Sequence, residues 1–132
     1  MEYEINSDTL AIIPYQKGKS KILELNEEYI VNLTPYQVIE NSCSYYGSSL
    51  NGRMNGARSI LGSVYKIPVM VEETNNLIFF PTTAIENEKN VWIGSNNILN
   101  YEKKGKNTVV EWKNNKKTEF NMPILSIETQ LL

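Results

Sequence analysis

The sequence contains no histidine and a single cysteine, Cys43. Without histidine, the commonest general base and metal ligand is missing, and a lone cysteine forms neither a Cys–His nucleophile pair nor a zinc site of the usual composition. The phosphate-binding and nucleophile motifs G-x-x-x-x-G-K-[ST], G-x-G-x-x-G and G-x-S-x-G are absent as well. We therefore expect no enzyme, no metal site and no cofactor.

Long apolar runs are also missing. No run approaches the roughly 18 residues of a transmembrane helix, and the start of the chain, MEYEINSD, is acidic where a signal peptide is basic. One cysteine forms no disulfide within the chain, which fits a reducing compartment. We expect a cytoplasmic protein without a membrane partner. The 132 residues, 41% hydrophobic and 21% charged, predict a single globular domain over residues 1–132.

Arginine is also rare: the chain has two arginines, Arg53 and Arg58, and 11 lysines. Both lie in the stretch 41–62, NSCSYYGSSLNGRMNGARSILG, and residues 41–71 contain no Asp or Glu although the net charge of the chain is −2. This pattern favours a surface for a negatively charged partner; chance in an asparagine-rich chain is the alternative. Arginine offers a planar fork that lysine lacks, so both arginines are candidate contacts, with solvated helix charges as the alternative.

Apolar patterns and turn residues predict an α+β fold, with two consecutive central helices packed with antiparallel strands and hairpins. Thr34 as N-cap and Pro35 at the first position predict a helix to about Tyr46, with Gly47 just beyond its end. Cys43 falls on the apolar face of this helix and is expected in the core. Strands are expected at 9–14, 22–25, 28–33, 64–71, 77–80, 91–94, 98–101, 108–112 and 117–120.

The second helix is predicted to begin at Ser48 or Ser49, with Leu50, Met54, Ala57 and Leu61 as its apolar stripe. The two serines can hold a phosphate with the free N–H groups of a helix start, and plain capping is the alternative. A second basic segment, residues 103–117, has six lysines and one acid, and it begins with Lys103, Lys104 and Lys106. It reads either as a phosphate contact or as a solvated hairpin.

The central stretch resembles a known signature. SCSYYGSS, followed by Gly52-Arg53 and Gly56, resembles the pattern S-C-x-aromatic-aromatic-G-S-S-x-x-G-R-x-x-G of ComK, the competence transcription factor family of Bacillus and related bacteria. The similarity spans residues 3–128, and further matches occur in the same order at Tyr3-Glu4-Ile5-Asn6, Ile12-Ile13-Pro14, Lys66-Ile67-Pro68-Val69, Phe79-Phe80-Pro81-Thr82 and Trp92-Ile93. Ile67 stands where the family has the first proline of K-P-P-I.

The resemblance implies a DNA-binding transcriptional activator. ComK proteins bind paired A-tract and T-tract boxes largely through the minor groove, bend the DNA and act as oligomers at promoters of DNA-uptake genes. By analogy we expect AT-rich double-stranded DNA as the partner, a homodimer or higher oligomer, and contacts from Arg53, with Ser48, Ser49 and Lys66 as helpers. Arg58 lies outside the family motif and rests on the charge argument alone.

Longer ComK proteins carry a basic C-terminal tail that mediates adaptor-dependent proteolysis and contributes to activation. This chain stops at Leu132, so we expect a short family member or a truncated form, without the adaptor and protease partners of the tail. The alternative function is a protein-interaction module that does not bind DNA and modulates a full-length ComK or its adaptor.

Overall fold

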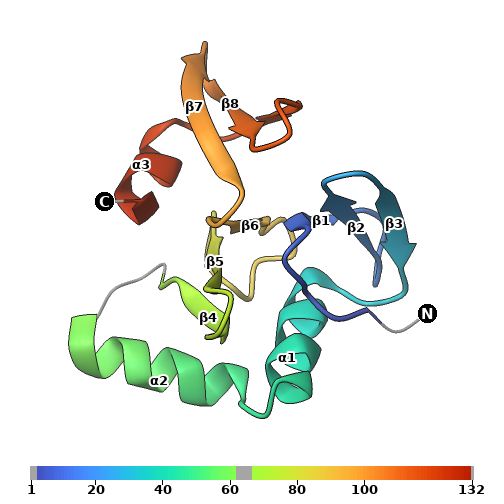
Figure 1. Ribbon diagram of the computed structural model, residues 1–132, viewed down its shortest axis with the longest axis vertical. Helices are drawn as coiled ribbons and strands as arrows, with labels where there is room; N and C mark the ends of the chain where they lie inside the picture. Colours follow the sequence, from blue (N-terminus) through green and yellow to red (C-terminus); the bar gives the residue numbers. More distant parts are fainter. Residues whose placement is uncertain (1–2, 62–66, 132) are drawn as a thin grey trace. The chain divides into compact units, whose positions relative to one another are not determined.

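A computed structural model describes residues 3–61 and 67–131, with side chains omitted for residues 56–61 (Figure 1). The chain divides into two compact units, residues 1–96 and 97–132. The single domain expected over 1–132 stays a prediction, because two such units can form one domain. The predicted α+β class is confirmed: helices and antiparallel sheets combine in the described residues, and two consecutive helices lie between strands. No described helix is long and apolar enough to cross a membrane.

The first unit is built on a six-stranded antiparallel sheet in the order β3-β2-β1-β6-β5-β4. In β1, Ile12 lies opposite Ile22 on one side and Trp92 on the other. All three side chains are fully buried, so the centre of the sheet is part of the core. The strands are β1 (Thr9–Pro14), β2 (Ser20–Glu24), β3 (Glu28–Val31), β4 (Val69–Glu72), β5 (Leu77–Pro81) and β6 (Trp92–Gly94).

The strand expected over residues 64–71 is shorter than the apolar pattern suggested. Strand β4 begins at Val69, while Ile67 and Pro68 have no strand assignment. Proline has no N–H to donate to a neighbouring strand, which limits pairing at this position. The first three residues of the expected strand, 64–66, lie outside the described residues.

Helix α1 (Pro35–Tyr45) has the predicted signals at both ends. Thr34 Oγ1 accepts the N–H of Gln37 at 3.2 Å, and Gln37 Oε1 accepts the N–H of Thr34 at 2.9 Å, which is a complete capping box. Gly47 follows the helix with φ +84, a left-handed conformation that glycine adopts without strain. The buried face of α1 includes Val38, Ile39 and Ser42, and also Cys43, which was expected there.

Helix α2 (Leu50–Leu61) follows after a short turn (Figure 1). Leu50 and Met54 are buried, which confirms the first half of the predicted apolar stripe. The side chains of Ala57 and Leu61 lie outside the described residues. Helix α2 contacts β4 and α1, so its first half belongs to the core of the first unit.

The second unit has a three-stranded antiparallel sheet, in the order β7-β8-β9, and a C-terminal helix. Its elements are β7 (Ile98–Lys104), β8 (Asn107–Trp112), β9 (Lys117–Phe120) and α3 (Leu125–Leu131). Val110, Trp112, Phe120 and Ile127 are buried here. The apolar C-terminal segment forms the helix α3.

Candidate nucleic-acid interface

Ser48 belongs to the end of α1 rather than to the start of α2. Its N–H donates to the carbonyl of Cys43 at 2.9 Å, and the N–H of Gly47 donates to the carbonyl of Ser44 at 3.0 Å. This pair of bonds is a Schellman motif. The hydroxyl of Ser48 also donates to Cys43 O, at 3.2 Å. Both donors of Ser48 thus close the end of α1, which favours a structural role over phosphate binding.

Ser49 is the N-cap of α2. Its Oγ accepts the N–H of Gly52 at 3.0 Å, and its carbonyl accepts the N–H of Arg53 at 3.0 Å. A Cβ at position 52 would lie 2.9 Å from Ser49 Oγ, so glycine there leaves room for the cap. Ser49 is exposed, and capping uses only its oxygen as acceptor. Its hydroxyl proton therefore remains a donor for a phosphate at the helix start.

Arg53 forms an ion pair with a carboxylate, although residues 41–71 of the sequence contain no Asp or Glu. Its Nη1 lies 2.6 Å from Glu73 Oε1, a carboxylate in the turn between β4 and β5. The Arg53 side chain is 24% exposed and that of Glu73 is 70% exposed. The Nε of Arg53 is buried and has no hydrogen-bond partner among the described residues. The guanidinium is thus partly covered and held by one exposed carboxylate.

The structure leaves two expected contacts untested. Arg58 lies in α2, but its side chain is outside the described part. Successive residues of an α-helix are about 100° apart, so positions 53 and 58 differ by about 140° around the axis of α2. They do not share one helix face. Lys66 lies within residues 62–66, which the structure does not describe.

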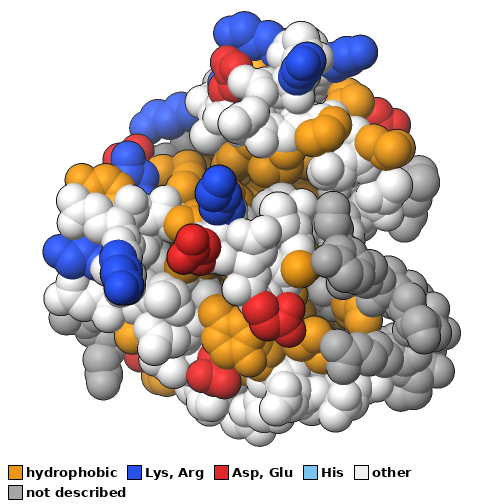
Figure 2. Space-filling view, turned by 180° about the vertical axis from the view of Figure 1, so that it is seen from behind, with side chains coloured by type: hydrophobic (Ala, Val, Ile, Leu, Met, Phe, Trp, Pro, Cys, Tyr) orange, Lys and Arg blue, Asp and Glu red, His pale blue; other side chains and the backbone are white. Residues whose placement is uncertain are grey.

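Lys103, Lys104 and Lys106 lie at the tip of the β7–β8 hairpin. Gly105, with φ +60, opens its two-residue turn, so Lys106 is held at the tip. Lys104 Nζ lies 3.0 Å from Glu119 Oε1, while within the described residues Lys103 and Lys106 form no ion pair and both are exposed. Figure 2 shows Lys side chains gathered over this hairpin, at the top of the view, with acidic side chains beside them.

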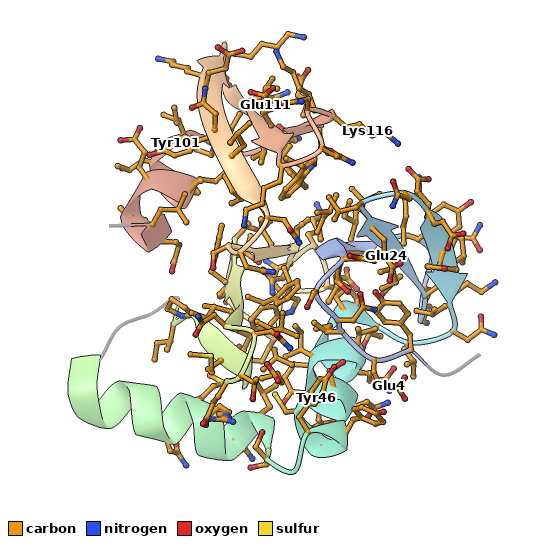
Figure 3. All side chains as sticks on the ribbon, viewed as in Figure 1. Glu4, Glu24, Tyr46, Tyr101, Glu111 and Lys116 are labelled. Carbon is orange, nitrogen blue, oxygen red and sulfur yellow. The ribbon has the colours of Figure 1, made fainter. Side chains whose placement is uncertain are left out.

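Strand register reduces the basic character of one face of this sheet. Glu102 lies opposite Val109, which lies opposite Glu119, and Glu111 lies opposite Lys117. Cross-strand partners share a face, so carboxylates from β7, β8 and β9 surround Lys104 and Lys117. The sequence count of residues 103–117 included only one of these acids. The unpaired positive charge therefore lies at the strand ends, and Figure 3 shows Lys116 pointing away from the ribbon at the β8–β9 turn.

The adjacent tyrosines of α1 have different roles. Tyr46 donates from its hydroxyl to the carbonyl of Ile5 at 2.6 Å, and Ser42 Oγ accepts the N–H of Ile5 at 3.0 Å. These two bonds attach the N-terminal segment to α1. Tyr45 is 65% exposed and packs edge-on against the Tyr46 ring. Burial raises the pKa of the Cys43 thiol, which fits the core residue that we expected.

Comparison with known proteins identifies the family. The family model described as ComK protein matches residues 1–132. The chain belongs to the ComK family. A Bacillus subtilis (strain 168) protein named competence transcription factor is 32% identical over 133 residues, an alignment that covers 98% of this chain and 69% of the relative. The resemblance found in the sequence is therefore confirmed. No solved structure matches the chain.

The structure explains most of the ComK signature in this chain as backbone geometry. Ser42 holds Ile5, Gly47 takes the left-handed turn, Ser49 caps α2 and Gly52 makes room for the cap. Three of these positions, Gly47, Ser49 and Gly52, lie at the junction between α1 and α2. Arg53 is the charged residue of the signature, and this position makes it the strongest candidate contact of this ComK protein. Its guanidinium is paired with the exposed carboxylate of Glu73, which a DNA contact would have to replace.

Proposed function

We propose that this protein is a DNA-binding transcriptional regulator of competence genes, which binds A-tract and T-tract boxes largely through the minor groove. The observation that carries the proposal is the family match over residues 1–132. The name of the Bacillus subtilis relative, competence transcription factor, supports the same role. Two parts of the proposal, the regulation of DNA-uptake genes and the binding to A-tract and T-tract boxes, rest on the resemblance to the ComK family.

Arg53 is proposed to enter the groove from the first turn of α2. A narrow A-tract minor groove has an enhanced negative potential that attracts arginine. The ion pair with Glu73 involves a carboxylate that is 70% exposed, so solvent and DNA can reach it. On binding, the negative potential of the groove replaces Glu73 as the partner of the guanidinium. Ser49 supports this contact with its hydroxyl at the same helix start.

Lys103 and Lys106 are proposed to contact the DNA backbone from the β7–β8 hairpin. Both are exposed and without an ion pair among the described residues, so a phosphate is not in competition with a carboxylate of this sheet. Such contacts are independent of sequence and depend on salt, because each neutralised phosphate releases counterions. Lys104 is bound to Glu119 and is expected to contribute less.

The test is fluorescence anisotropy of a labelled duplex with two A-tract/T-tract boxes, against a GC-rich duplex, at two salt concentrations. We expect tighter binding to the A-tract duplex and weaker binding at higher salt. Arg53→Ala should reduce the preference for A-tracts. Lys103→Gln with Lys106→Gln should weaken binding to both duplexes and lower the salt slope by about 2, since each phosphate contact contributes about 0.9.

The matched control removes the same number of charges at the other turn of the same sheet. Lys113→Gln with Lys116→Gln should lower the salt slope by less than the hairpin pair does. Equal effects would assign the lysine contribution to net charge alone. Absence of binding to either duplex would overturn autonomous DNA binding and favour the protein-interaction module. Light scattering of the same samples tests the proposed homodimer or higher oligomer.

A further inference from the structure

A cleft of about 930 Å³ lies in the first unit, apart from the residues proposed for DNA. Its walls come from the β1–β2 turn with Pro14, from the start of α1, from the loop 85–90 and from Trp92 on β6. The volume is within the range of small-molecule sites, roughly 300–1,000 Å³. All of these segments belong to one compact unit, so the cleft is a property of that unit alone.

Two of the residues that line the cleft, Asn90 and Trp92, carry buried hydrogen-bond donors that lack partners among the described residues. The side-chain Nδ2 of Asn90 and the indole Nε1 of Trp92 are both buried without a hydrogen-bond partner among the described residues. Asn90 is 2% exposed and Trp92 is fully buried. Most buried polar groups in proteins have a partner, so two orphaned donors in one cleft need an explanation.

The orientation of the Asn90 amide is fixed by its other end. Its Oδ1 accepts the backbone N–H of Thr82 at 2.9 Å and that of Thr83 at 3.0 Å. An amide nitrogen in that position could not accept either bond. The Nδ2 group therefore points away from both threonines. The missing partner cannot be explained by exchanging the oxygen and nitrogen positions of the Asn90 amide.

The lining of the cleft is mainly apolar and includes aromatic side chains, and its charged residues are basic on balance. Tyr15 is 51% exposed, and Tyr36 and Pro35 line the cleft at the start of α1. Three lysines stand against two glutamates among the lining residues: Lys17, Lys19 and Lys89 against Glu86 and Glu88. The first turn of α1, where a helix favours negative charge, has no acidic residue.

We propose that this cleft binds a small planar organic anion: an aromatic or heteroaromatic ring that carries hydrogen-bond acceptors and one carboxylate or phosphate group. The ring packs on Tyr15 and Tyr36, its acceptors take the N–H groups of Asn90 and Trp92, and its charged group lies toward the lysines. A peptide main chain fits less well, because it alternates donors and acceptors while the orphaned groups are donors only. A DNA duplex is too wide to enter a cleft of about 930 Å³.

The test follows the two orphaned donors directly by ¹⁵N–¹H NMR of the full chain. The probes are the four ribonucleoside monophosphates, nicotinate, indole-3-carboxylate and 4-hydroxybenzoate, with inorganic phosphate and a proline-rich decapeptide as comparisons. We expect saturable shifts of the Trp92 indole and Asn90 amide signals with at least one planar anion. The indole of Trp112 donates to Thr118 Oγ1 at 2.9 Å in the second unit, so its signal is the internal reference and should not move.

Two variants and a control assign the site. Asn90→Asp keeps the oxygen that accepts from Thr82 and Thr83 but replaces the donor with a second oxygen, and it should weaken binding about tenfold or more. Tyr15→Leu removes an exposed ring and should weaken binding about tenfold. Tyr45→Leu, which removes an exposed ring on another part of α1, should leave binding unchanged.

Several outcomes overturn the proposal. They are no shift with any planar anion, equal shifts with inorganic phosphate, and binding of the decapeptide but not of the anions. Unchanged binding in a folded Asn90→Asp variant does so as well. If that variant does not fold, equal affinities of Tyr15→Leu and Tyr45→Leu are decisive. The readout uses no DNA, so its result and that of the anisotropy experiment are independent.

Discussion

Glu73→Gln should strengthen DNA binding, although it removes an ion pair from the folded protein. In the free protein Glu73 Oε1 holds Arg53 Nη1 at 2.6 Å. If Arg53 enters the groove, this contact must break first, and its free energy opposes binding. Glutamine keeps the size of the side chain, and the turn keeps its backbone bond from Asn76 N–H to Glu73 O at 3.1 Å.

The size of the effect follows from the exposure of the pair. Glu73 is 70% exposed and Arg53 is 24% exposed, and ion pairs at the protein surface contribute about 0.2–1 kcal/mol. Releasing Arg53 should therefore raise DNA affinity by up to about fivefold, because 1 kcal/mol corresponds to about that ratio. The free energy of unfolding should fall by no more than about 1 kcal/mol. Both effects should shrink as salt screens the pair.

The assay is anisotropy with the A-tract duplex, run beside urea unfolding of the same proteins. Glu28→Gln is the matched control, because it makes the same change in charge on β3, at an exposed residue. A gain in affinity that disappears in the double variant Arg53→Ala/Glu73→Gln would assign it to the ion pair. If Glu73→Gln and Glu28→Gln raise affinity equally, the gain reflects net charge, and the ion pair between Arg53 and Glu73 does not oppose DNA binding.

Three further predictions concern the cap, the sheet and the N-terminal segment. Ser49→Ala should lower the free energy of unfolding by about 1 kcal/mol, measured by thermal unfolding, because the cap of α2 is lost. Ser49→Asp keeps the cap but should weaken DNA binding in the anisotropy assay, because the carboxylate repels phosphate. Unweakened binding by Ser49→Asp would argue against a phosphate contact at this residue. Gly94→Ala places a Cβ 2.9 Å from the buried Phe79 ring and should cost about 1–3 kcal/mol in urea unfolding; an unchanged midpoint would refute the clash. Burial, with a hydrogen bond to Glu24, raises the pKa of Tyr3 above its ordinary value of 10.0, so the folded state favours the neutral phenol. Its contribution to stability is complete below about pH 10 and decreases at higher pH. Tyr3→Phe should therefore flatten the alkaline loss of stability, and equal slopes would contradict this reasoning.

The helices show which part of the fold can be predicted from local signals. Thr34, Pro35 and Gly47 act on backbone groups within five residues of themselves, so the ends of α1 can be predicted without knowing what it packs on. The sequence pattern likewise predicted strands over 108–112 and 117–120, where the structure has β8 and β9. The apolar pattern of residues 64–71 did not give the start of β4, because it takes no account of Pro68, which lacks the N–H for strand pairing, or of the partner strand β5.

The sequence by itself determined the fold class, the ends of α1 and the ComK family of this protein, because short-range geometry and a contiguous signature carry them. Only the tertiary structure decided what surrounds the charged residues. Glu73 reaches Arg53 from 20 residues away, Glu119 reaches Lys104 across the sheet, and the cleft with Asn90 and Trp92 combines four separate segments. Which residues become neighbours depends on strand register and on how distant segments of the chain pack together. Neither can be predicted from the spacing of residues along the chain.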